Sequence, residues 1–126
     1  MAEEYVAYIG EVRAFAFGFI PKDWLTCDGQ VIKVNQYMEL FSLLGTTYGG
    51  DGMTTFGLPD LRGRMIIDKG QGPGLTARRL GDKGGQEATG TAADNTKADA
   101  AAGNNMPPFL TLNYCIRMEG QYPTRE

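Results

Sequence analysis

Glycine is the feature of this sequence that most limits its fold, because 18 of its 126 residues are glycine and six more are proline. Glycine adopts left-handed backbone conformations that other residues avoid, and proline fixes its own φ angle. Many such positions indicate many turns between short elements, which favours β-structure over a helical bundle. The length suits one domain with a modest core. We therefore expect a single, mainly β domain over residues 1–126.

One segment has helical rather than β character. Asn35 is a suitable N-cap, and Gly45 can supply the left-handed residue that ends a helix. Between them, apolar residues follow the i, i+3, i+4, i+7 spacing of one buried helical face: Tyr37, Leu40, Phe41 and Leu44. The pattern predicts one short α-helix over about residues 35–44. Such a short helix is marginal alone and depends on docking.

Strand patterns fill most of the remaining chain. The predicted strands are 5–20 with a bend near Gly10 or Gly18, then 24–27, 31–34, 54–58, 61–68 and 110–118. Asp28-Gly29 is a hairpin signal between the second and third of these. The last strand has the strongest alternation, with one face made of Leu110, Leu112, Tyr114, Ile116 and Met118.

The segment from Gln86 to Asn105 contains no Val, Ile, Leu, Met or aromatic residue. It cannot contribute much to a hydrophobic core. Two interpretations remain open. It is either a flexible surface loop or an extended arm that orders against a neighbouring subunit.

The absence of histidine limits the chemistry of the chain. It excludes Ser-His-Asp and Cys-His nucleophiles and histidine zinc sites. Two cysteines, Cys27 and Cys115, cannot hold a structural zinc ion unaided. They form a disulfide if the protein meets an oxidising medium. The alternative, which we favour, is a pair of buried reduced thiols on strands.

The charge pattern argues against nucleic acid as a partner, because the net charge is only −3 and the Lys and Arg residues are scattered. No stretch approaches the length of an apolar membrane helix, so we expect no membrane insertion. The N-terminus begins with acidic residues and has no long apolar run behind them, which predicts no Sec signal peptide.

Several ordered phrases are specific enough to indicate a family. Residues 9–13 (IGEVR), 24–30 (WLTCDGQ), 41–52 (FSLLGTTYGGDG) and 55–64 (TFGLPDLRGR) occur in that order, and residues 105–116 and 120–125 complete the series. Together they resemble the phage tail-collar domain, as found in the microcystin-dependent protein group. Family members usually carry a longer variable region with a His-x-His element that is associated with zinc in short tail fibres. This chain has no histidine there, so the resemblance implies neither a metal site nor a cofactor.

The resemblance implies a structural role in a small, compact, β-rich domain with extended arms, located in a virion tail or at a cell surface. We expect copies of the chain to assemble into a trimer or an extracellular filament by strand addition. The predicted interface combines the apolar N-terminal strand with the last strand: Tyr5, Val6, Tyr8, Ile9, Leu110, Leu112 and Tyr114.

Two alternative functions remain. The first is a carbohydrate-binding adhesin that recognises a cell-surface glycan, with stacking aromatics chosen among Tyr48, Tyr122, Trp24 and Phe56. The second is a polysaccharide hydrolase, whose carboxylates would be chosen among Asp51, Asp60 and Asp68. Each aspartate lies near glycine, proline or arginine, where a turn or an ion pair explains it. We expect Asp60 to pair with Arg62 or Arg64, and no catalysis.

Overall fold

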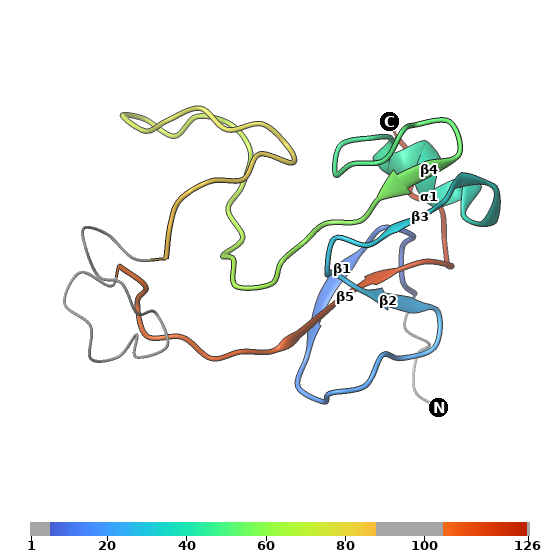
Figure 1. The fold of residues 1–126 in the computed structure, drawn as a ribbon, viewed down its shortest axis with the longest axis horizontal. Helices are drawn as coiled ribbons and strands as arrows, with labels where there is room; N and C mark the ends of the chain where they lie inside the picture. The colour runs from blue at the N-terminus through green and yellow to red at the C-terminus, as the bar shows by residue number, and fades with distance from the viewer. Residues whose placement is uncertain (1–5, 88–104, 126) are drawn as a thin grey trace. The chain divides into compact units, whose positions relative to one another are not determined.

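The structure is a computed structural model that describes residues 6–87 and 105–125. The chain divides into two compact units, residues 1–81 with 112–126, and residues 82–111. All named helices and strands belong to the first unit (Figure 1). They are β1 (Val12–Phe15), β2 (Trp24–Thr26), β3 (Val31–Lys33), the 3-10 turn η1 (Val34–Gln36), α1 (Met38–Leu44), β4 (Thr55–Gly57) and β5 (Asn113–Arg117). The predicted fold class, mainly β with one short helix, is confirmed.

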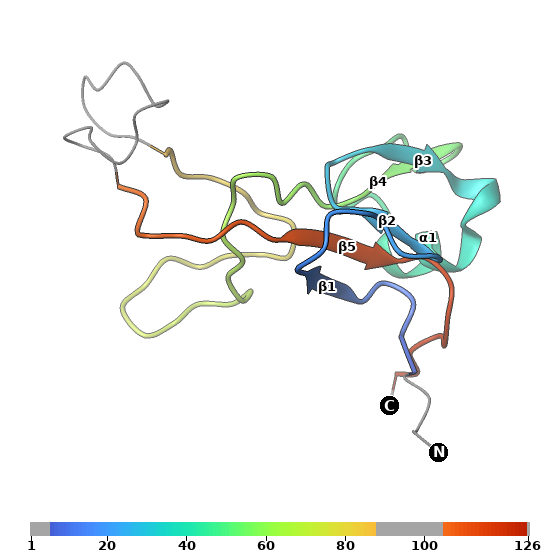
Figure 2. The same ribbon diagram turned by 90° about the horizontal axis from the view of Figure 1, so that it is seen from below.

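Three strands form the first sheet, in the order β1-β5-β2, and both pairs are antiparallel. Figure 2 shows β5 between its two neighbours. Ile116 of β5 lies opposite Leu25, while the next residue back, Cys115, lies opposite Thr26 and Arg13. Because successive strand residues point to opposite faces, these two buried side chains enter two different core clusters. The central strand is therefore covered on both faces.

The second sheet pairs β3 with β4, with Ile32 opposite Phe56. The predicted hairpin at Asp28-Gly29 is wrong, since β2 and β3 belong to different sheets. After β2 the chain instead pairs with the segment that follows β4: Gly29 N–H donates to the Pro59 carbonyl at 3.1 Å, and Asp28 forms a bridge with Asp60. These contacts hold the segment that connects β2 in the first sheet to β3 in the second.

The helix is shorter than predicted and begins differently. Asn35 lies in η1, and α1 starts after Tyr37 without any side-chain cap. Because η1 already turns the chain at residues 34–36, Asn35 is not available as the N-cap. The predicted end is confirmed, since Gly45 has φ +56° and its N–H donates to the Phe41 carbonyl at 2.8 Å. No helix in the described part of the chain is long and apolar enough to cross a membrane.

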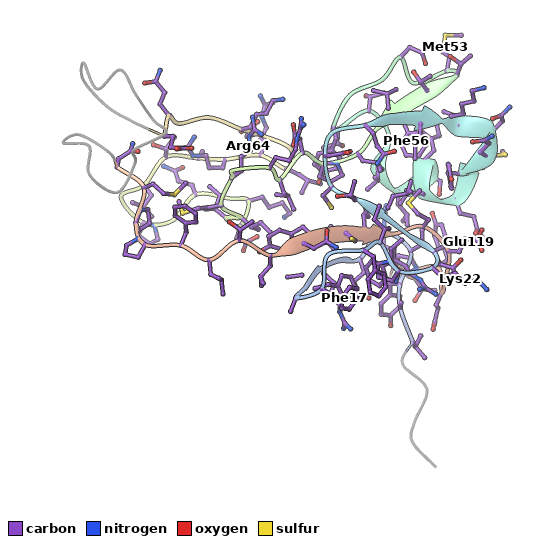
Figure 3. The ribbon with its side chains drawn as sticks, turned by 60° about the horizontal axis from the view of Figure 1, so that its bottom comes forward. Phe17, Lys22, Met53, Phe56, Arg64 and Glu119 are labelled. Atoms are coloured by element: carbon purple, nitrogen blue, oxygen red, sulfur yellow. The ribbon has the colours of Figure 1, made fainter. Side chains whose placement is uncertain are left out.

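The main core lies between the β3–β4 sheet, α1 and one face of the first sheet. The ring of Phe56, labelled in Figure 3, is fully buried and lies 5.4 Å from the ring of Phe41. The buried members of this core come from well-separated parts of the chain: Ile9, Cys27, Leu40, Phe56, Leu58, Ile116 and Met118. A smaller cluster of Ala7, Trp24 and Cys115 covers the opposite face of β5.

One strand prediction is wrong and another is too long. Residues 61–68 form no strand, although their sequence is typical of one, because no strand of the described chain lies beside them to pair with. The last strand begins at Asn113 rather than at Leu110. The predicted arm at 86–105 falls almost entirely on residues 88–104, which lie outside the described residues.

Candidate self-assembly surfaces

The N-terminal part of the predicted interface is paired with the end of its own chain. Ile9 N–H donates to the Gln121 carbonyl at 2.9 Å, Gln121 N–H donates to the Ala7 carbonyl at 3.0 Å, and Tyr8 forms a parallel bridge with Gln121. Val6 and Tyr8 have exposed side chains, whereas Ile9 is buried in the main core. Tyr5 lies outside the described residues. Of the described members, Val6 and Tyr8 are the ones that present surface here.

The C-terminal part of the predicted interface changes from exposed to covered as the chain enters β5. Leu110 has 85% of its surface exposed and Leu112 is also exposed. Tyr114 lies opposite Ala14 in the sheet and packs against the main core. The exposed leucines therefore precede the strand, and the tyrosine belongs to it. Whether any of these residues meets another copy stays a prediction.

The outer edge of β1 has free backbone hydrogen-bonding groups. Arg117 N–H donates to the Glu11 carbonyl at 2.9 Å, so by alternation Arg13 and Phe15 also direct their backbone groups toward β5. The N–H and C=O groups of Val12 and Ala14 then point away from the sheet. In residues 6–87 and 105–125, no backbone group bonds to them on that side. β1 thus offers a template for another strand.

The other edge of the same sheet, β2, is partly capped. Its outward groups belong to Trp24 and Thr26, because Cys27 N–H donates inward to the Tyr114 carbonyl. Trp24 N–H donates to the Pro21 carbonyl at 3.2 Å. The Gln30 side-chain amide donates to the Thr26 carbonyl at 3.3 Å. Local turns therefore use part of this edge, and β1 is the more open of the two.

An exposed apolar run lies in the segment that follows β4. Met65, Ile66 and Ile67 have 68%, 57% and 65% of their surfaces exposed. Consecutive side chains of an extended segment point to alternate sides, so neither side of this run is covered. Just before it, Arg62 makes two parallel hydrogen bonds of 2.9 Å to the Asp60 carboxylate, and Arg64 lies 3.7 Å from the same group. The predicted pairing of Asp60 with these arginines is confirmed, and it fixes the base of the exposed run.

A row of aromatic rings, which alternate along the predicted strand 5–20, continues from β1 into the following loop. The rings of Phe15 and Phe17 lie 5.1 Å apart, and Phe17 stacks on Phe19 at 4.4 Å. Phe17, labelled in Figure 3, and Phe19 are both exposed. Asn113 holds this loop, since its side-chain amide donates to the Phe17 and Phe19 carbonyls. The surface beside the β1 edge is therefore apolar and ordered.

The candidate catalytic aspartates have structural roles at two of the three positions. Asp51 accepts hydrogen bonds of 2.8–2.9 Å from the N–H groups of Thr55, Met53 and Thr54, which hold its pKa well below the usual range. The Arg62 side chain does the same for the pKa of Asp60. Both carboxylates therefore stay ionised near neutral pH, which suits loop closure and does not suit a general acid. Asp68 is exposed on the apolar run.

The aromatic residues considered for sugar stacking are mostly unavailable. Trp24 and Phe56 are buried in the two core clusters, and Tyr48 is partly buried. Tyr122 is exposed, but its hydroxyl lies 2.7 Å from the Ser42 hydroxyl on α1. For metals, the described residues contain no group of three or more Cys, Asp and Glu side chains placed to hold an ion.

Cys27, which follows β2 directly, and Cys115 of β5 pack on opposite faces of the first sheet. Cys27 packs in the main core, and Cys115 packs with Trp24 in the smaller cluster. Both are buried free thiols in the structure. Burial raises the pKa of Cys27 to about 12, with smaller contributions from Cys115 and Asp28. Side chains that point to opposite faces are badly oriented for a disulfide bond.

The open edge and most of the first unit lie within a recognisable family region. Residues 10–66 match the model of the Phage Tail Collar Domain family. This region is similar to the phage tail collar domain. The collar match runs from the turn before β1 to the middle of the exposed apolar run, and it confirms the family that the sequence phrases indicate.

Two curated relatives are similar to parts of this chain. Protein RhiB of Rhizobium leguminosarum bv. viciae is 29% identical over 102 residues, which cover 77% of this chain and 46% of RhiB. Short tail fiber protein gp12 of Enterobacteria phage T4 is 33% identical over 69 residues, which cover 54% of this chain and 13% of the fibre protein. The aligned residues span less than half the length of either relative.

Proposed function

We propose that this chain is a structural, non-enzymatic subunit that assembles with copies of itself. The assembly is a tail-fibre component or an extracellular filament, located in a virion tail or at a cell surface. The open outer edge of β1 is the observation that carries this proposal, because the outward backbone groups of Val12 and Ala14 have no partner within residues 6–87 and 105–125. The relationship to a short tail fibre protein supports the structural role.

Strand addition is the mode of assembly that suits this edge. Protein chains that function as monomers usually protect an open edge with charges, prolines or a covering loop. Here Val12, Phe17 and Phe19 expose apolar surface along β1 and the loop after it. An added strand would satisfy the backbone groups and cover part of that surface. Leu110 and Leu112, and Val6 and Tyr8 at the N-terminus, offer further apolar contacts between copies.

Replacing Ala14 by proline tests the proposal directly. The outward N–H of Ala14 makes no hydrogen bond within the described chain, so its loss leaves the β1–β5 pairing intact. We expect Ala14→Pro to remain folded by circular dichroism and to lose assembly in light scattering and negative-stain microscopy. Ala14→Thr is the matched control, since it keeps the N–H. If the Ala14→Pro variant assembled to the same extent as the wild-type chain, strand addition at β1 would be contradicted.

Glycan recognition is a second candidate function, favoured by one observation. Phe17 and Phe19 form an exposed stacked pair whose loop is held by Asn113. Flat aromatic surfaces of this kind stack on the apolar faces of sugars. We expect Phe19→Ala to remove any signal on a glycan array if this function operates. An array that detects no binding by the wild-type chain would eliminate it.

A further inference from the structure

We propose that the strand added to β1 is the apolar run of a second copy, residues 64–68. This inference rests on the proposed function, since it names the donor that fills the open edge. The run is defined by Arg64, Met65, Ile66, Ile67 and Asp68. The inference pairs the open edge of β1 with a segment that belongs to no sheet in the described chain.

The first argument is that the run has a strand sequence and no strand partner. Ile66 and Ile67 are β-branched residues, which favour strands, and Met65 extends the apolar stretch. In the described chain this stretch pairs with nothing and stays exposed on both sides. An isolated extended chain does not hold a strand conformation without cross-strand hydrogen bonds. Since residues 6–87 and 105–125 supply no partner strand, we infer that a second copy supplies it.

The second argument concerns how the run is attached. Gly63 and Gly70 flank it with φ angles of +66° and +114°, and in both cases an added Cβ would meet nothing within 4 Å. The Asp60–Arg62 pair fixes the chain on one side. On the other side, Gly70 and Arg78 exchange backbone hydrogen bonds of 2.7 and 2.9 Å. The run therefore lies between the Asp60–Arg62 ion pair and the Gly70–Arg78 bridge, with a glycine near each end.

The third argument is that the other exposed apolar segments are less suitable donors. Residues 7–9 already pair with Gln121 of their own chain. Leu110 and Leu112 lead directly into β5, so the central strand of the sheet holds them in place. Pro107 and Pro108 come shortly before them and lack an N–H to donate. Residues 64–68 contain no proline.

The fourth argument is that the two partners match on both faces. Along β1, Val12 and Ala14 share one face, and Phe15 lies on the other with the Phe17–Phe19 row beyond it. Apolar surface is thus exposed on each side of the edge. The donor also has apolar side chains on both sides, Met65 and Ile67 on one and Ile66 on the other. Strand addition covers all of these at once.

A mixing experiment tests the donor separately from the edge. Ala14→Pro blocks the edge and keeps the donor. The double variant Ile66→Pro with Ile67→Pro blocks both backbone directions of the donor and keeps the edge. Its matched control is Ile66→Val with Ile67→Val, which keeps the strand propensity. We expect each blocked variant to be monomeric alone, the valine control to assemble, and an equal mixture of the two blocked variants to form a dimer of twice the chain mass.

Each result leads to a different conclusion. Normal assembly by the double-proline variant, with Ala14→Pro monomeric, would overturn the donor and leave strand addition at β1 standing. A mixture that stays monomeric would also overturn the pairing of these two elements. Normal assembly by Ala14→Pro would instead reject strand addition at β1, and a wild-type chain that stays monomeric would reject the proposed function itself. A dimer in the mixture, absent from either variant alone, supports the donor.

Discussion

Gly29 approaches Asp60 so closely that a Cβ on the glycine would lie 3.0 Å from the Asp60 Cβ. The glycine also has φ +77°, a conformation that L-residues rarely adopt. Its N–H donates to the carbonyl of Pro59, the residue before Asp60. This contact joins the chain between the two sheets to the loop that carries Arg62 and Arg64.

Gly29→Ala is therefore expected to destabilise the protein. Left-handed backbone strain costs roughly 1–3 kcal/mol for a residue other than glycine, and the contact with Asp60 adds to it. Chemical denaturation with matched m-values measures the loss. Gly18→Ala is the control, because Gly18 has no left-handed φ and open space around it. Equal effects at the two positions would contradict the role of the Asp60 contact.

Local structure was largely predictable from the sequence. The spacing of Leu40, Phe41 and Leu44 identified the helix, and Gly45 identified its end. Short apolar runs between turn residues identified β2, β3 and β4. These signals work because each depends on residues close together in the chain.

Strand pairing was not predictable, because it depends on residues far apart in the chain. Asp28-Gly29 carries a local hairpin signal, yet β5 takes the place beside β2. For the same reason the sequence could not identify β1 as the open edge. Nor could it distinguish Ile9, which is in the core, from Val6, which is exposed. Both are apolar residues in the same predicted strand, and their difference in burial appears only in the folded structure.

Acid stability is expected to depend on Asp51. Backbone hydrogen bonds from Thr55 and Met53 and bonds from Thr54 lower its pKa below the ordinary value of 3.8. The unfolded chain therefore binds a proton before the folded chain does, and stability falls as the pH drops below about 3.8. Unfolding midpoints from neutral pH down to about pH 2 measure this loss.

Asp51→Asn should reduce the acid dependence, because the amide does not titrate, while Asp60, whose pKa Arg62 lowers, retains its own share. Asp68→Asn is the matched control, since Asp68 is exposed and accepts no comparable set of hydrogen bonds from the described residues. An unchanged acid limb in Asp51→Asn, measured against that control, would count against the structural role of this carboxylate.

The two thiols are expected to remain reduced and unreactive in the folded protein. Burial raises the pKa of Cys27 to about 12, so little thiolate exists near neutral pH. Alkylation of the folded chain should be slow and should accelerate as the pH rises, and the denatured chain should react at both positions. Because the unfolded thiol ionises first, stability should also decline between pH 9.0 and about 12. An intramolecular disulfide in mass spectra of protein prepared without reductant would contradict this expectation.

The ring of Phe56 is expected to determine whether the first unit folds. It is fully buried against Phe41 of α1, and that helix has only seven residues and depends on docking. Phe56→Ala should cost roughly 3–5 kcal/mol, enough to unfold a small domain and remove the helical circular dichroism signal. Phe19→Ala deletes the same atoms from a ring that is 66% exposed, and its effect on stability should stay below about 1 kcal/mol. Comparable losses in the two variants, measured by urea unfolding, would mean that the loop after β1 supports the fold as strongly as the core does.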